Sequence, residues 1–174
     1  MNKILNTEVV TPVSTEVISL AQAKARLRVD SSDDNDTITA IISEARSLIE
    51  GFCGISIGEQ ERAVKADVCE LFQIPYGPVT SVDAVNLYDS TDDDYTDELT
   101  AGDDYRIIND LYKPYKAGET KIEYTAGYTS ESIPTGLKNA WYSLIAHLYE
   151  NRGDGGIPVD IRQKLNPYTR NFGI

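Results

Sequence analysis

The amino-acid sequence predicts an α+β fold, in which a mainly helical bundle carries an inserted antiparallel β-rich subdomain. Two observations support this prediction. Apolar residues recur at three- and four-residue steps near 34–53 and 134–152, which is the spacing of one face of an α-helix. Between these stretches, short β-rich pieces alternate with turn-forming Gly, Pro and Asp residues, a pattern typical of antiparallel strands. At 174 residues, the chain fits one domain.

Two helices are expected near the N-terminus. Ser19 and Gln22 have the spacing of a capping box, which predicts a short helix over "LAQAKARL", residues 20–27. Asp33 or Asp34 is the expected N-cap of the longer helix that follows, because a carboxylate there lies at the positive end of the helix dipole. The apolar stripe of this helix consists of Ile38, Ile41, Ile42, Ala45, Leu48, Ile49 and Phe52.

The middle of the chain is expected to form short strands, in the pieces "QERAVKADV", "CELFQI", "VDAVNLYD", "DYRII" and "TKIEYTAGY". The acidic stretch "STDDDYTDELTAGDD" has two interpretations, a calcium loop or a solvated hairpin tip. Asp92 and Asp94 are followed by Thr96 and Asp97, without the Gly that a calcium loop has at its turning position. The spacing therefore favours a solvated hairpin tip.

A second long helix is predicted over residues 134–152, with Pro134 at its first position and Gly153 after its end. Its apolar stripe consists of Leu137, Ala140, Trp141, Leu144, Ile145 and Leu148. A short helix, "VDIRQKL", follows. The expected organisation is a single domain, 1–174, with a helical core over 18–56 and 134–166, a β-rich insertion over 57–131 and a C-terminal arm over 166–174.

Composition and charge exclude several classes of protein. Hydrophobic residues make up 41% and charged residues 25%, which is typical of a globular chain. We find no signal peptide and no apolar run long enough to span a membrane. Cys53 and Cys69 have no paired spacing and lie among apolar residues, so both are expected to be buried free thiols. The net charge of −12, concentrated in residues 61–133, argues against a protein that binds DNA through a broad basic surface.

The sequence offers no positive support for an enzyme. His147 is the only histidine, and Ser143 and Glu150 lie within helical reach of it. A Ser-His-Glu set on one straight helix has poor geometry for catalysis, because a convex surface provides neither a pocket nor oxyanion donors. With one His and two separated Cys residues, a zinc site would also lack ligands. We therefore expect no catalytic residues, no metal and no cofactor.

Aromatic and Arg residues are concentrated in the C-terminal quarter, and these types dominate contacts between proteins. Pro167 is expected to stop the last helix. In an extended tail, Tyr168, Arg170 and Phe172 alternate and would point to the same side. The predicted residues for binding a neighbouring protein are Tyr149, Arg152, Pro167, Tyr168, Arg170 and Phe172.

Several segments together resemble one known family. They are "ISLAQAKARLRVDSSDDNDTITAIISEARSLIEGFCGISI", "IPYGPVTSVDAVNLYD", "YTAGY", "IPTGLKNAWYSLIAHLYENRG" and "LNPYTRNF". Their order and spacing over residues 18–172 resemble the tailed-phage head-to-tail connector (adaptor) proteins, and the long insertion is similar to that of the larger members. The most specific parts are the SL-x3-K-x2-L opening and the string from Ala140 to Arg152.

This resemblance implies a structural subunit without catalysis. Such proteins form a ring, typically of twelve copies, beneath the portal at the virion neck. The ring extends the DNA channel and offers a platform to the tail. The implied partners are further copies of the chain, the portal protein, and a tail or neck-completion protein. DNA would pass without specific binding, and no membrane is involved. The protein would be made in the host cytoplasm and located in the virion neck.

The negative net charge would help DNA to pass through such a ring. A negative channel wall repels DNA phosphates and lets the duplex slide. The competing hypothesis is a free-standing acidic binding module, such as a regulator that covers a basic partner surface. The mass of the protein in solution separates the two, because ring formation supports the connector and a monomer that binds a basic protein supports the module.

Overall fold

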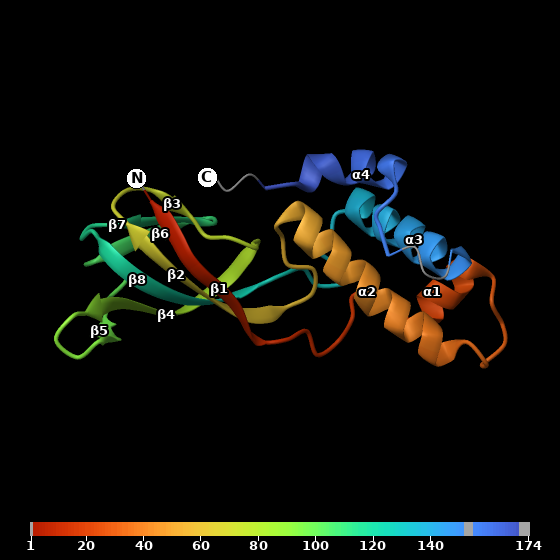
Figure 1. Ribbon diagram of the computed structural model, residues 1–174, viewed down its shortest axis with the longest axis horizontal. Helices are drawn as coiled ribbons and strands as arrows, with labels where there is room; N and C mark the ends of the chain where they lie inside the picture. Colours follow the sequence, from red (N-terminus) through yellow and green to blue (C-terminus); the bar gives the residue numbers. More distant parts are fainter. Residues whose placement is uncertain (1, 152–154, 171–174) are drawn as a thin grey trace. The chain divides into compact units, whose positions relative to one another are not determined.

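The computed structural model describes residues 2–151 and 155–170 (Figure 1). The chain divides into two compact units. In the described residues, the sheet unit comprises 2–14 and 59–127, and the helical unit comprises 15–58, 128–151 and 155–170. Each unit has a hydrophobic core of its own.

The helical unit contains four α-helices and one 3-10 turn. They are α1 (Leu20–Leu27), α2 (Asn35–Cys53), α3 (Thr135–Glu150), α4 (Val159–Leu165) and η1 (Asn166–Tyr168). Apolar residues at helical spacing on α2 and α3 meet in the core, where Trp141 is fully buried and donates its indole N–H to the Ile42 carbonyl over 3.3 Å. None of the described helices combines the length and apolar character needed to cross a membrane.

The predictions for the N-caps of the first two helices were partly correct. The Ser19 hydroxyl accepts the Gln22 N–H at 3.3 Å, and the Gln22 side chain accepts the Ser19 N–H at 3.1 Å, so the predicted capping box of α1 is confirmed. Asp34 occupies the N-cap position of α2, but its side chain makes no capping hydrogen bond. Its carboxylate instead accepts the Tyr149 hydroxyl, as described below.

The sheet unit contains eight strands in two antiparallel sheets (Figure 1). They are β1 (Lys3–Thr11), β2 (Gln60–Val68), β3 (Phe72–Gln73), β4 (Val79–Asp89), β5 (Asp94–Glu98), β6 (Tyr105–Ile108), β7 (Leu111–Pro114) and β8 (Gly118–Ala126). One sheet has the order β1-β2-β8-β4-β5, and the other has the order β3-β7-β6. β1 and β5 are therefore the edges of the larger sheet, and β3 and β6 are the edges of the smaller one.

The core of the sheet unit follows the two-residue period of its strands. Val64, on β2, lies opposite Ile122, on β8, and both are fully buried. Tyr112, on β7, is buried in the same cluster. Tyr124 is buried with its hydroxyl donating to the Pro75 carbonyl over 2.7 Å, and burial raises the pKa of this phenol. Alternate residues of the central strands thus form the core, as expected for strands that bury one face.

The prediction of a mainly helical bundle is wrong. The described chain is β-rich, because it contains eight strands in two antiparallel sheets and only four α-helices. The strands include about as many residues as the helices. The two long amphipathic helices gave the strongest pattern because their periodicity extends over many residues. β1 gave no comparable pattern, because it is exposed along almost its whole length and lacks alternation between buried and exposed positions.

Candidate interaction surfaces

Tyr149, one of the predicted partner-binding residues, contacts its own unit. It is half-buried near the end of α3, and its hydroxyl donates to the Asp34 carboxylate over 2.7 Å. This bond links the last turn of α3 to the first turn of α2. A role for Tyr149 in binding a partner stays a prediction, and Arg152 lies outside the described residues.

The described part of the C-terminal segment also contacts the helical unit. Pro167 is the middle residue of the 3-10 turn η1, and Tyr168 packs against the helical core. The Tyr168 hydroxyl lies directly against Gly136 of α3, in the space that a Cβ atom would occupy in any other residue. Glycine at position 136 therefore allows this close contact between Tyr168 and α3. The Arg170 N–H donates to the Cys53 carbonyl over 2.8 Å.

The segment therefore turns at residues 166–168 instead of leaving the last helix fully extended. Phe172 lies outside the described residues, so the predicted one-sided row of Tyr168, Arg170 and Phe172 stays a prediction. Cys53 itself is buried, and burial raises the pKa of its thiol to about 11. Cys69, expected to be buried, is exposed.

His147 lies beside a shallow hollow of about 380 Å³ in the helical unit. The hollow is lined by charges of both signs, among them Arg26, Glu150, Asp160 and Lys164. The Ser143 hydroxyl donates to the Asn139 carbonyl of its own helix over 3.0 Å, so its proton is directed away from His147. This arrangement does not prepare Ser143 as a nucleophile, since His147 would have to accept that proton.

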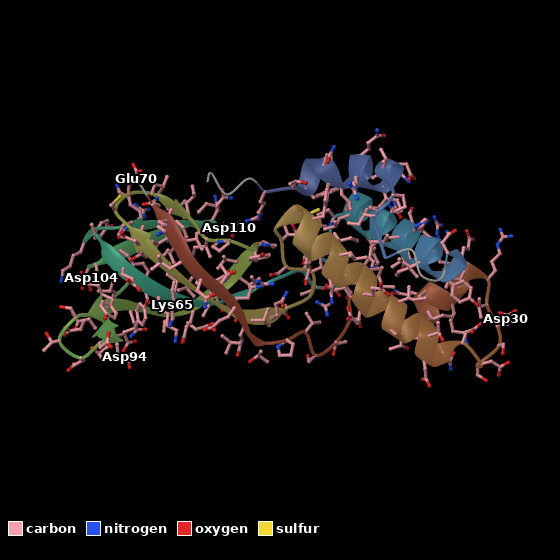
Figure 2. The ribbon with its side chains drawn as sticks, in the orientation of Figure 1. Asp30, Lys65, Glu70, Asp94, Asp104 and Asp110 are labelled. Carbon is pink, nitrogen blue, oxygen red and sulfur yellow. The ribbon has the colours of Figure 1, made fainter. Side chains whose placement is uncertain are left out.

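The acidic stretch "STDDDYTDELTAGDD" lies on and beside the β4–β5 hairpin, where Figure 2 labels Asp94. Several carboxylates of the hairpin accept hydrogen bonds from the hairpin itself. The Thr91 N–H donates to Asp89 over 2.7 Å and lowers the pKa of that carboxyl. The Tyr88 hydroxyl donates to Asp93, which raises the pKa of the phenol. No group of three or more potential metal ligands gathers among the residues that the structure places.

We expect calcium to bind this hairpin no more tightly than about millimolar, the weak end for calcium-binding modules. The carboxylates lack the regular ligand spacing of a calcium loop, and some already accept hydrogen bonds from the hairpin. Isothermal titration of the protein with calcium chloride checks this. Saturable binding in the micromolar range, lost in an Asp92→Asn/Asp94→Asn variant, would contradict it.

A partly buried ionic network in the helical unit had no counterpart among the predicted residues. The Arg46 guanidinium contacts Glu16 and Glu50, each at 3.0 Å. Glu16 also accepts the Ser43 hydroxyl at 2.8 Å, and Glu50 accepts the Ile57 N–H at 2.6 Å. The network fixes the segments before α1 and after α2 to the α2 helix. The i,i+4 spacing of Arg46 and Glu50 was visible in the sequence, whereas the contact with Glu16 depends on the fold.

Two strand edges of the sheet unit were also missed. β1 carries four large apolar side chains that are exposed, those of Ile4, Leu5, Val9 and Val10. Beside β6 lies an open hollow of about 570 Å³, whose other wall is the first part of β4, from Val79 to Val82. The adjacent apolar residues Ile4 and Leu5, and the pair Val9 and Val10, were the available signal for β1.

An exposed edge strand with apolar side chains, such as β1, is a surface on which another chain can pair. The chain belongs to the family described as head completion protein, which matches residues 16–156. This membership confirms the predicted resemblance to head-to-tail connectors and the predicted function as a structural connector subunit. It argues against the free-standing regulator and is consistent with a non-enzymatic role.

Three solved structures are similar to the chain over nearly its whole length. They are described as the virion of a native gene transfer agent particle, the neck of an empty gene transfer agent particle computed with C6 symmetry, and the neck of the native particle computed with C12 symmetry. Their TM-scores are 0.78, 0.78 and 0.74. Each matched chain is 20% identical to this one in sequence, and each alignment covers 98% of this chain and 99% of the matched chain. A search of curated proteins finds no match.

Proposed function

We propose that the protein is a ring-forming subunit in the neck of a phage-like particle, placed between the portal and the tail. The observation that carries this proposal is the combination of family membership with a structural likeness that extends over 98% of the chain, so that it includes both units. The C6 and C12 symmetries of the similar necks support a ring with sixfold or twelvefold symmetry. The role is structural and involves no catalytic step.

The net charge of −12 per subunit suits a ring around a DNA channel. Acidic side chains exposed on a channel wall repel phosphates, and DNA can then pass without being retained. The β4–β5 hairpin supplies many of these charges. The six predicted partner-binding residues, Tyr149, Arg152, Pro167, Tyr168, Arg170 and Phe172, remain our candidates for contact with the portal or the adjacent subunit.

The proposal is tested by removing residues 171–174 and assembling particles with the shortened subunit. This deletion includes Phe172 and spares Tyr168 and Arg170, which contact the helical unit. We expect the shortened subunit to melt within a few degrees of the full chain, while particles accumulate as DNA-filled heads without tails. Electron micrographs count the tailed fraction, and circular dichroism follows the melting.

A Phe172→Tyr variant serves as the matched control, because it keeps the aromatic ring and should keep most of the tailed particles. Normal tailing by the shortened subunit would refute the attachment role of these residues. A particle neck whose cryomicroscopy density contains no ring of this chain would refute the proposed function as a whole.

A further inference from the structure

The outer edge of β1 is available for pairing. β1 pairs with β2 on one side, and no described strand pairs with it on the other. Its side chains Ile4, Leu5, Val9 and Val10 are 36% to 54% exposed. An exposed edge strand with apolar side chains is a template for a further strand, which natural proteins usually protect by charge, by distortion or by a partner. β1 carries the exposed charges of Lys3 and Glu8, and its pairing with β2 is irregular between Val9 and Thr11. Its four apolar side chains nevertheless stay exposed, and a partner strand would cover them.

A second available edge lies elsewhere on the same unit. β6 pairs with β7 on one side. On its other side, Ala101 forms a parallel bridge with Tyr105, whose carbonyl accepts the Gly102 N–H over 2.8 Å, and Arg106 and Ile107 border the hollow of about 570 Å³. The pairing of β4 with β5 begins at Asn86, so the stretch Val79–Val82 that forms the opposite wall has no described strand partner on this side. Ile107 lines the hollow, and Ile108 is half exposed. The hollow thus combines a strand edge with apolar side chains.

The two edges are complementary in charge. Glu8 on β1 and Arg106 on β6 are both exposed, and neither forms an ion pair with another described residue. If the strands are aligned in parallel with Glu8 beside Arg106, Val9 and Val10 fall beside Ile107 and Ile108. This register puts opposite charges together and brings Val9 and Val10 next to Ile107 and Ile108, and such cross-strand pairs stabilise a sheet.

We propose that β1 of one subunit adds to the β6 edge of the next subunit and forms the contact that builds the ring. This inference rests on the proposed function, since it names the subunit contact of that ring. A ring needs a heterologous interface, in which two different patches of the same chain meet, whereas β1 pairing with β1 would give a closed two-fold dimer. The sheet unit carries two such different patches.

The proposal is tested by a zero-length cross-link between chains. An Arg106→Lys variant provides an amine that a carbodiimide can join to the Glu8 carboxylate. Mixing nitrogen-15-labelled and unlabelled chains identifies links between different chains by mass spectrometry. We expect a mixed-isotope link between positions 8 and 106 at protein concentrations where sedimentation velocity shows association. Glu8→Gln should abolish it.

Charge reversal gives an independent measurement on the otherwise unchanged chain. Glu8→Arg or Arg106→Glu alone should weaken self-association at least about tenfold, because like charges then face each other across the contact. The double variant with both changes should recover to within about threefold of the original chain. Glu131→Arg, which reverses an exposed charge on the helical unit, should have little effect. Circular dichroism confirms that all variants fold.

Two results would overturn the inference. One is a chain that stays monomeric up to about millimolar concentration without the mixed-isotope link. The other is association that the reversals leave unchanged. If the particle neck contains a ring of this chain but the link between positions 8 and 106 is missing, the inference fails and the proposed function stands. If the neck contains no such ring, the proposed function fails.

Discussion

Replacing Trp141 with alanine is expected to lower the free energy of unfolding by about 4 kcal/mol, the usual range for truncating a fully buried large aromatic residue. The side chain is completely inaccessible and lies in the core between α2 and α3. Its removal leaves a cavity that the two long helices cannot close without changing their packing. It also removes the indole N–H donor to the Ile42 carbonyl. Urea unfolding followed by far-ultraviolet circular dichroism measures the change.

Two variants separate the contributions. Trp141→Phe keeps most of the ring volume and should lose roughly 1 to 2 kcal/mol, the combined effect of a smaller side chain and a missing hydrogen bond. Tyr115→Ala removes an aromatic side chain that is 53% exposed and should change stability by less than about 0.5 kcal/mol. A loss below about 1 kcal/mol for Trp141→Ala would contradict the tight packing of α2 against α3.

Replacing Arg46 with methionine should lower the free energy of unfolding by about 3 kcal/mol, because breaking a buried pair leaves a carboxylate without its cation. The Arg46 side chain is 17% exposed, and that of Glu50 is 9% exposed. Glu50 must also keep accepting the Ile57 N–H, so it cannot turn towards solvent without losing that hydrogen bond. The same change removes the charge opposite Glu16. Chemical unfolding measures the loss.

Lys164→Met is the matched control, since it removes a cation from another i,i+4 pair on a helix. The Lys164 Nζ atom lies 3.7 Å from the Asp160 Oδ2 atom, and the two side chains are 53% and 70% exposed. Such surface ion pairs contribute little to the free energy of unfolding. We expect a change of less than about 0.5 kcal/mol. Equal effects of Arg46→Met and Lys164→Met would show that the Arg46 network does not hold the helical unit together.

The helices were predictable because each satisfies local rules that are written in a few neighbouring residues. The Ser19 and Gln22 pair specifies its own cap, and the apolar stripes of α2 and α3 continue over several turns. β2 was predicted over the same residues that the structure assigns to it, since Val64, Ala66 and Val68 alternate with charged residues. In these segments, the local pattern and the tertiary packing agree.

The remaining features depend on contacts between distant residues. β1 has exposed positions on both faces, so its residues contain no alternation to detect, and its pairing with β2 is visible only in the folded chain. For the same reason the balance between helix and sheet was misjudged. At the candidate interaction surfaces, the residue types suggested contacts between proteins. They did not indicate that Tyr149 bonds to Asp34 or that Tyr168 packs beside Gly136.

The register of β1 has a consequence for the order in which the protein folds during synthesis. Lys3 pairs with Asp67, so β1 is synthesised before its partner and stays unpaired until α1, α2 and then β2 have been made. β2 in turn pairs with β8, which is synthesised later still. Such non-local pairing is slow, and apolar strands are prone to aggregate before their partner strands have been synthesised. Among the eight described strands, β1 is thus the one that waits longest for its first partner.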